Sequence, residues 1–397
     1  MRGKNKKPRM NNYLNNRFFH KYSLILFNLF LFLLFMLISE AEMVSSLFCR
    51  VPIKSVFINN SSELSFPFEQ LSRFVSLSLF HKQAFFIENG QENMQFFSIS
   101  GINYSLYRVN DTFVSSGGFL IKDGILYSTS SFYHGNMSLF SYGFKWCGNK
   151  DRVLLLSHIG STIFGHFFID FLSPLMLLPQ EIYQNSVIPF VENPRFYMKI
   201  CLRLFGIPEK NVVVFNRNEF MYCKTVFFLN PYPHYFFSNG AYFLLSQRLR
   251  DYLHLPNVTP TKYFFSNRIK GPRGISNMKN IIESLSILFP SVVIHREESS
   301  KTLRKNAFAF NQAKLYFCGF HGSGFANLFF MRPLTVYVEI QTFESFPSAL
   351  YVCSSLGVNY FYSTMSSIKH FNKSSHYVPQ SVYLPLLEKA IKYSLQN

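Results

Sequence analysis

The chain has 397 residues, of which 48% are hydrophobic and 18% aromatic. This length is sufficient for two ordinary domains, and the apolar content excludes a chain that is disordered throughout. The formal net charge of +18 is concentrated in the first 21 residues and in residues 258–377, so the basic excess belongs to a leader and to one later region.

The chain begins with a basic leader that an apolar run follows directly. Residues 1–21 contain no carboxylate, and Tyr22–Ile38 is almost wholly apolar. We predict a cytoplasmic tail over 1–21 and a transmembrane signal-anchor over 22–38, because basic residues keep their side of an apolar helix in the cytoplasm. The alternative is a cleaved signal peptide with Ser39 and Ala41 at its cleavage site. Residues 39–75 are predicted to form a stem.

Glycosylation signals and cysteines agree with a lumenal location beyond the anchor. The predicted N-glycosylation sites are Asn59, Asn60, Asn103, Asn110, Asn136, Asn257 and Asn372, each of which begins an Asn-x-Ser/Thr triplet. Six cysteines suit an oxidising compartment, and the lack of a Cys-x-x-Cys pair argues against a zinc site. We therefore expect a protein of the Golgi or endoplasmic reticulum membrane whose partner is a phosphate-bearing small molecule and not a nucleic acid.

Strand-like and helix-like segments alternate from about Ser76 to the end of the chain. The predicted strands are Val153–Ile159, Asn211–Phe215, Thr225–Leu229, Lys262–Asn267, Ser291–His295, Lys314–Phe320 and Leu334–Ile340. The predicted helices are His166–Leu178, Ser246–Leu253, Asn277–Phe289, Lys301–Ala313, Ala326–Met331 and Val382–Leu395. This alternation indicates an α/β fold with parallel sheets.

The segment His254–Thr261 has two prolines and is predicted to be an exposed linker between two Rossmann-like domains that face a cleft. We assign residues 76–257 to an N-terminal domain and residues 258–377 to a C-terminal domain that binds the phosphate-bearing ligand. Residues 378–397 are predicted to form a helix that packs back on the first domain. Ligands of such sheets gather at the carboxyl ends of the strands.

In the first domain, His166 and Asp170 are the only polar residues between Gly165 and Ser173. Four residues apart on a helix, they share one face. A carboxylate on an otherwise apolar helix suits general-base catalysis at a cleft. The alternative is that the two side chains bond to one another and simply join two elements.

In the second domain, basic and glycine-rich segments favour an anion. Arg268 and Arg273 follow a strand, and arginine binds phosphate through a bidentate fork. The turn His321–Gly324 precedes a short helix, where glycine backbone amides can approach an anion closely. The alternative for the arginines is a pair of solvated loop residues. Glu339, in the following strand, would accept a ribose hydroxyl or pair with an arginine.

No Asp-x-Asp sequence occurs in the chain, so the simplest carboxylate pair for a metal on a nucleotide diphosphate is missing. We therefore expect no metal site and no required cofactor. Arginines and helix-end amides would hold a diphosphate instead.

Three segments together resemble the catalytic domain of glycosyltransferase family 61: "GHFFIDFLSPL", "FFSNRIKGPRGISN" and "GFHGSGFANLFFMRPLTVYVEI". The resemblance covers roughly residues 150–360. It implies a two-domain GT-B fold and inverting transfer from a UDP-sugar without a required metal. Because the family includes xylosyl- and N-acetylglucosaminyltransferases, xylose or N-acetylglucosamine is the expected sugar. The acceptor is expected to be a hydroxyl of a glycan or glycoprotein, and residues 76–257 would be the acceptor-side domain.

The resemblance also assigns roles to residues. Asp170 would be the catalytic base, and His166 would orient it. The expected nucleotide-sugar-binding residues are Arg268, Arg273, His321, Gly322, Ser323, Gly324, Asn327 and Glu339. Asn267 and Met278 replace the serine and glutamate that are usual in the family, which leaves a catalytically inactive lumenal binder of glycans as the alternative. An oxidoreductase lacks support, because no Gly-x-Gly-x-x-Gly follows an early strand.

Overall fold

The computed structural model describes residues 54–57, 69–75, 79–88, 91–99, 103–122, 125–128, 145–156, 160–216, 219–230, 239–267, 273–296, 302–320, 323–342, 348–365 and 375–397. The predicted tail and signal-anchor lie outside these ranges, as do Arg268, His321 and Gly322. Within the ranges given, no helix combines the length and the apolar content that crossing a bilayer requires.

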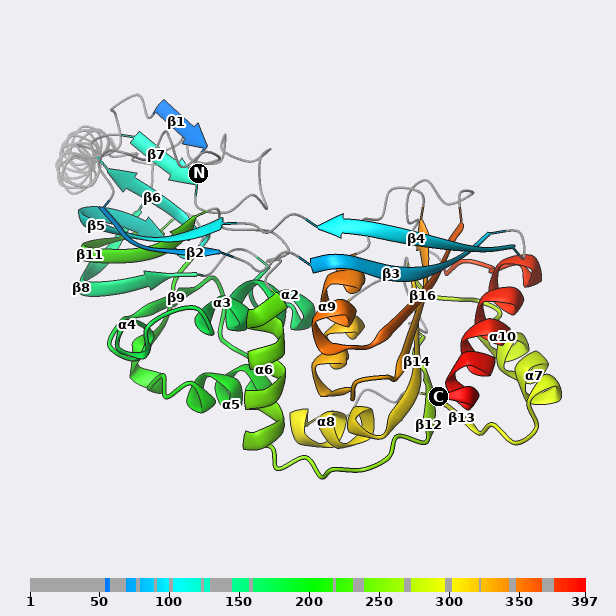
Figure 1. The fold of residues 1–397 in the computed structure, drawn as a ribbon. Helices are drawn as coiled ribbons and strands as arrows, with labels where there is room; N and C mark the ends of the chain where they lie inside the picture. The colour runs from blue at the N-terminus through cyan, green and yellow to red at the C-terminus, as the bar shows by residue number, and fades with distance from the viewer. Residues whose placement is uncertain are drawn as a thin grey trace, which may run out of the picture.

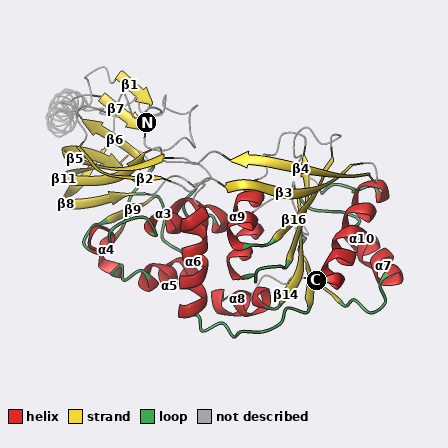
Figure 2. Ribbon diagram, viewed as in Figure 1, coloured by secondary structure: helices red, strands yellow, loops and turns green. Residues whose placement is uncertain are grey.

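Two seven-stranded sheets dominate the structure, with helices between them (Figures 1 and 2). We call the part built on the first sheet the N-terminal unit and the part built on the second sheet the C-terminal unit. In Figure 1 the N-terminal unit lies at the left and the C-terminal unit at the right, with α6, α8 and α9 between the two sheets.

The strands of the N-terminal unit are β1 (Lys54–Phe57), β2 (Glu69–Val75), β5 (Asn103–Ser115), β6 (Phe119–Lys122), β7 (Ile125–Ser128), β8 (Lys145–Leu155), β9 (Ile188–Phe190), β10 (Val212–Val214) and β11 (Glu219–Asn230). Its helices are α2 (Phe164–His166), the π-helix η4 (Phe167–Leu172), α3 (Ser173–Leu175), α4 (Gln180–Gln184), α5 (Phe196–Leu204), the 3₁₀ helix η5 (Glu209–Asn211) and α6 (Asn239–Tyr252).

The first sheet has the strand order β1-β7-β6-β5-β11-β8, with β2 also paired to β5. Its central pairs β2–β5, β5–β6, β6–β7 and β5–β11 are antiparallel. The pairs β8–β11 and β1–β7 are parallel. The first sheet is therefore mixed, whereas the sequence predicts a Rossmann-like alternation. One reason is the tight turn between β5 and β6, where Gly118 has a φ of 88° that favours glycine. β9 and β10 form a separate two-stranded parallel sheet next to β8.

The strands of the C-terminal unit are β3 (Leu79–Glu88), β4 (Gln91–Ile99), β12 (Lys262–Phe265), β13 (Ile294–Arg296), β14 (Ala313–Phe320), β15 (Val336–Thr342) and β16 (Asn359–Met365). Its helices are α7 (Met278–Leu288), α8 (Leu303–Asn311), the 3₁₀ helix η6 (Ser323–Phe330), α9 (Ser348–Leu356) and α10 (Gln380–Gln396). All predicted strands and helices beyond residue 258 are present, with shifted ends.

The second sheet has the order β13-β12-β14-β15-β16-β3-β4. The pairs from β13 to β16 are all parallel. Numbered from β12, the first five strands follow the order 2-1-3-4-5, a doubly wound arrangement whose topological switch point lies between β12 and β14. Buried strands of this type consist of nearly continuous apolar runs, as β14 and β15 do.

The hairpin β3–β4 extends this second sheet, since β3 pairs in parallel with β16. The sequence analysis assigns these residues to the first domain, so the units do not follow the order of the chain. The pairing extends to Glu88 and Gln91. In the sequence these residues flank Asn-Gly, a dipeptide that is favoured in two-residue hairpins. The hairpin is thus visible in the sequence, but its distant partner strand is not.

The C-terminal helix α10 packs on the second sheet, and not on the first domain as the sequence analysis expects. Its buried residues Tyr383, Leu386, Leu387, Ala390 and Ile391 share one apolar core with α7 and with β12, β14 and β15. Their spacing places them on one helix face that needs an apolar surface, and the near surface is the α7 side of the second sheet.

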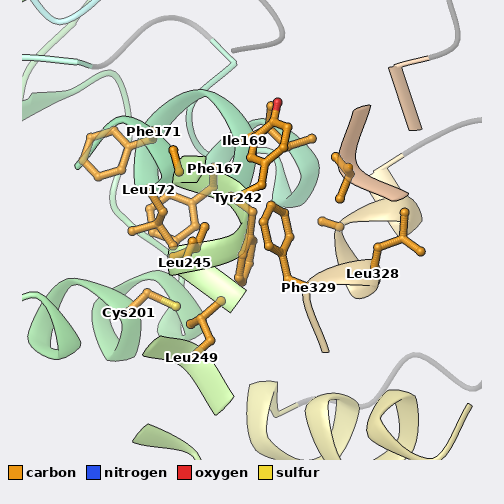
Figure 3. Packing of buried hydrophobic residues seen from close by; sticks show 14 of the residues in the cluster. Phe167, Ile169, Phe171, Leu172, Cys201, Tyr242, Leu245, Leu249, Leu328 and Phe329 are labelled. Atoms are coloured by element: carbon orange, nitrogen blue, oxygen red, sulfur yellow. The ribbon is translucent and has the colours of Figure 1, made fainter. Parts of the chain in front are cut away.

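A separate core joins the two units. It contains Phe167, Phe168 and Phe171 from η4, residues of α5 and α6, and residues of η6, α8 and α9. In Figure 3 the rings of Tyr242 from α6 and Phe329 from η6 lie side by side, with Phe167, Leu172 and Leu245 close by. The helices that carry the two sets of predicted site residues therefore share one packed interior.

Candidate functional site

The predicted anion-binding segments follow β12 and β14, the strands on either side of the switch point in the second sheet. β12 ends at Phe265 and β14 at Phe320, and the backbone N–H of Ser266 still bonds to the carbonyl of Phe317 at 2.8 Å. Chains that leave such neighbouring strands separate to opposite faces of the sheet, which opens a crevice for a ligand. Arg273 and Gly324 are thereby carried by two loops that begin at the same edge.

The loop that carries the arginines is closed by Asn267. Its side-chain amide donates to the carbonyl of Ile275 at 2.9 Å, and its side-chain oxygen accepts the N–H of Ile275 at 2.8 Å. Ile275 also forms a β-bridge to His376, whose ring contacts Phe320 at the end of β14. Arg268 lies outside the described residues, whereas Arg273 is half-buried at the end of the closed loop. Asn267 stands where the family resemblance leads us to expect a serine. Its two side-chain hydrogen bonds hold this loop closed.

The other loop enters η6, which lies close against β14. A Cβ atom on Gly324 would meet the hydroxyl of Tyr316 at 2.8 Å and the Sγ of Cys318 at 3.1 Å. Tyr316 is fully buried, so it has no room to move away. Glycine at 324 therefore allows the start of η6 to lie on the sheet. Asn327, one turn later, is also buried.

Glu339 is fully buried in β15 and belongs to a hydrogen-bond network. Its Oε2 accepts a bond from the Tyr337 hydroxyl at 2.9 Å. Its Oε1 accepts bonds from Tyr360 at 2.5 Å and from Gln341 at 2.9 Å. Burial, together with the nearby Glu339 carboxylate, raises the pKa of Tyr337 and Tyr360 well above its usual value, so both remain donors.

Sequence reasoning missed the partners of Glu339. The signal was present in the alternation Tyr337-x-Glu339-x-Gln341, because residues two apart on a strand share a face. Tyr360 comes from the neighbouring strand β16, which local patterns do not reveal. The described hydrogen bonds of Glu339 come from phenol and amide donors. The predicted contacts with a ribose hydroxyl or an arginine stay a prediction.

His166 and Asp170 form a hydrogen-bonded pair in the N-terminal unit. The His166 Nδ1 lies 2.7 Å from the Asp170 Oδ2. Asp170 is fully buried, while 18% of the His166 side chain is exposed. Asp170 lies within the π-helix η4, and π-helical segments inside longer helices are frequent at functional sites. The exposed member of this pair is therefore the imidazole, and the carboxylate lies behind it.

The loop that leads into α2 is held by residues that the sequence analysis did not single out. The hydroxyl of Thr162 bonds to the carboxylate of Glu192, which follows β9. The hydroxyl of Tyr197 donates to the Thr162 carbonyl at 3.2 Å, and its ring packs edge-on against Phe164 and Phe167. Burial raises the pKa of Tyr197 to about 12. These contacts fix the start of the helix that carries His166.

The helices that carry the two candidate sites contact one another. α2 contacts η6, and the Phe168 ring lies 5.8 Å from that of Phe329 and 5.9 Å from that of Phe330, the last two residues of η6. The structure thus brings the helix of His166 and Asp170 against the helix that begins at the Ser323–Gly324 turn, at the interface of the two units.

Other predicted features are not part of the two candidate sites. Of the predicted glycosylation sites with described side chains, Asn110 and Asn257 are exposed; Asn103 has only its backbone described, and the others lie outside the described residues. Cys201 and Cys223 are buried free thiols. No group of metal-ligating residues occurs in the described part of the chain. A surface hollow beside α5, lined in part by Lys199, Arg203 and Glu209, contains none of the predicted site residues.

Comparison with known protein families gives one match. Residues 164–338 match the sequence model of the family described as Glycosyltransferase 61. The matched segment runs from the first residue of α2 to the middle of β15, so it contains the His166–Asp170 pair, the arginine loop and the glycine turn. No curated protein matches the chain.

Proposed function

We propose that this chain, whose catalytic region is a glycosyltransferase 61 domain, is an inverting transferase that moves a sugar from a UDP-sugar to a hydroxyl of a glycan or glycoprotein. The observation that carries the proposal is the contact between the helix of His166 and Asp170 and the helix η6 at the switch point of the second sheet. Family membership supports glycosyl transfer in general. The donor, the GT-B arrangement and the acceptor class are our extension of it.

In this proposal the UDP-sugar binds at the switch point between β12 and β14. Arg268 and Arg273 would bind the diphosphate together with the turn His321–Gly324, and Asn327 would support that turn. Negative charge develops on the departing diphosphate, and preorganised cations and N–H donors stabilise it. The proposal needs no metal. Xylose and N-acetylglucosamine remain the favoured sugars on the strength of the family resemblance.

His166 is proposed as the catalytic base, which reverses the two roles expected from the sequence. The Asp170 carboxylate is fully buried and bonds to Nδ1 of the partly exposed His166, so Asp170 would orient the imidazole and Nε2 would accept the proton. The acceptor hydroxyl loses its proton to Nε2 as its oxygen attacks the anomeric carbon. The bond from that carbon to the UDP oxygen breaks on the opposite face, and the configuration inverts.

The proposed protein is held in the Golgi or endoplasmic reticulum membrane by the signal-anchor, with the catalytic region in the lumen. This part rests on the basic leader, the apolar run and the glycosylation signals. The exposure of Asn110 and Asn257 is compatible with glycosylation at both positions.

The test is UDP release by the full-length chain in detergent, with a panel of UDP-sugars, candidate acceptors and EDTA. We expect release from one donor in the presence of an acceptor. His166→Ala should lower the rate by about 10²–10⁴-fold, the usual contribution of a general base. His295→Ala, at an exposed histidine on β13, is the matched control and should retain the wild-type rate.

The second candidate is a catalytically inactive lumenal protein that binds glycans. Met278 favours it, because this residue stands where the family usually has a glutamate and is buried in the apolar core of the C-terminal unit. A folded glycoprotein that releases no UDP and binds none would reject the enzyme in favour of this candidate.

A further inference from the structure

The last helix of the N-terminal unit, α6, holds the far end of η6. The hydroxyl of Ser246 donates to the Phe329 carbonyl at 2.6 Å. One turn later, the Arg250 guanidinium donates to the Phe330 carbonyl at 3.0 Å. Phe329 and Phe330 are the last two residues of η6, where carbonyl groups have no partner inside the helix. A hydroxyl and a cation from another unit therefore complete this helix end.

Arg250 is itself fixed in place. Its second terminal nitrogen donates to the Asn311 side chain at 2.6 Å, and Asn311 donates to the Pro256 carbonyl at 2.8 Å. The residues come from α6, from α8 and from the segment between the units. A positive charge at the carboxyl end of a helix also complements the helix dipole. This arrangement holds α6, α8 and η6 in one relative position.

The helix η6 depends on such support more than an α-helix would. It is a 3₁₀ helix of eight residues, and 3₁₀ runs beyond three or four residues are uncommon because their hydrogen bonds are poorly aligned. Besides the hydrogen bonds from Ser246 and Arg250 at its end, η6 is held by packing: the ring centroids of Phe329 and of Tyr242 of α6 lie 5.8 Å apart (Figure 3). The start of this same helix is the Ser323–Gly324 turn of the proposed donor site.

We propose that Ser246 and Arg250 position η6 for donor binding. A helix of the N-terminal unit, α6, would thereby set the affinity of the donor site in the C-terminal unit. The inference rests on the proposed function, because it treats the start of η6 as part of the UDP site. Ser246 and Arg250 are positioning residues, since they bond to the end of η6 that lies opposite the Ser323–Gly324 turn.

The same helix supplies a matched control. Arg248 lies two residues before Arg250 and also donates to the end of a helix, with its Nη2 3.1 Å from the Leu204 carbonyl of α5. Its guanidinium lies 4.5 Å from the centroid of the Phe205 ring. Arg248 therefore performs a similar task wholly within the N-terminal unit and does not contact η6 in the described hydrogen bonds.

The experiment compares full-length wild type with Arg250→Ala, Arg250→Lys, Ser246→Ala and Arg248→Ala. The Kd for UDP is measured by calorimetry, and the KM for the donor and kcat are measured by UDP release. Hydrogen exchange of the backbone amides of Ser323–Phe330 is measured without ligand. We expect Arg250→Ala to raise the Kd and KM about tenfold with a smaller change in kcat, which is the size of a lost hydrogen bond to a charged group. Ser246→Ala should raise them about threefold, and Arg250→Lys should restore part of the loss.

Exchange in η6 should accelerate in Arg250→Ala and remain at the wild-type rate in Arg248→Ala. If Arg250→Ala and Arg248→Ala lose thermal stability equally and bind UDP like wild type, the positioning role is wrong. If wild type binds no UDP, the proposed function fails, and the exchange rates still decide whether Arg250 and Ser246 hold η6. Should Arg250→Ala not fold, Ser246→Ala and Arg250→Lys give the same comparison.

Discussion

The structure contains two fully buried carboxylates beside the candidate site, and they differ in what stands next to them. Asp170 bonds to His166, whose side chain is 18% exposed. Glu339 bonds to Tyr337, Tyr360 and Gln341, which are all buried. The first network reaches the surface through an imidazole, whereas the second is enclosed in the sheet. A buried carboxylate is therefore a candidate for catalysis only where the side chain that it bonds to is exposed enough to contact a substrate.

The largest expected effect comes from replacing each carboxylate by its amide. Asp170→Asn should lower the transfer rate by about 10²–10⁴-fold with the fold intact, because the amide no longer holds His166 in the required tautomer. Glu339→Gln should leave the rate per folded molecule within about threefold. Rates of UDP release corrected for the folded fraction measure both, and equal losses would remove the distinction between the two networks.

Stability should respond in the reverse order. In Glu339→Gln one carboxylate oxygen becomes an NH₂ group that faces donors, so we expect a loss of about 2–3 kcal/mol in the free energy of unfolding. In Asp170→Asn the new NH₂ group can donate to Nδ1 of His166, so a hydrogen bond is kept in the other tautomer, and the cost should be about 1 kcal/mol. Urea unfolding of both variants measures the difference. A Glu339→Gln variant as stable as wild type would show that the enclosed network is not structural.

Alkaline pH should act on the enclosed network. The folded pKa of Tyr337 and Tyr360 lies well above 10.0, so each tyrosine ionises first in the unfolded chain. Their stabilising contribution is full below pH 10 and is lost as the pH rises above it. We expect a fall in stability above pH 10 with a slope of up to about one proton per tyrosine. Tyr360→Phe should reduce the slope, and an unchanged slope would assign it to other groups.

The smallest effect is expected at an exposed carboxylate. Asp151 pairs with Lys224 at 2.7 Å, but 83% of its side chain is exposed. Asp151→Asn should change neither the transfer rate nor the stability measurably, since exposed ion pairs contribute little. A clear loss of activity would show that the surface around β8 takes part in function, contrary to the comparison above.

The sequence predicts the C-terminal unit better than the N-terminal unit. In β14, η6 and β15 the runs of β-favouring residues, the glycines and Pro333 all lie within one short segment, so local patterns are sufficient. The pairing of β3 with β16 and the docking of α10 depend on partners far along the chain, which no local pattern contains. The His166–Asp170 contact follows from a spacing of four, but the exposure of each side chain depends on tertiary packing.

The hairpin β3–β4 has a consequence for how the chain reaches its final form. It is synthesised well before its partner strand β16. Sheet edges left open in this way are prone to pair with other chains, and non-local strand pairing is slow. The second sheet therefore cannot be completed before β16 has left the ribosome, and until then the open edge of the hairpin is expected to be a site of aggregation.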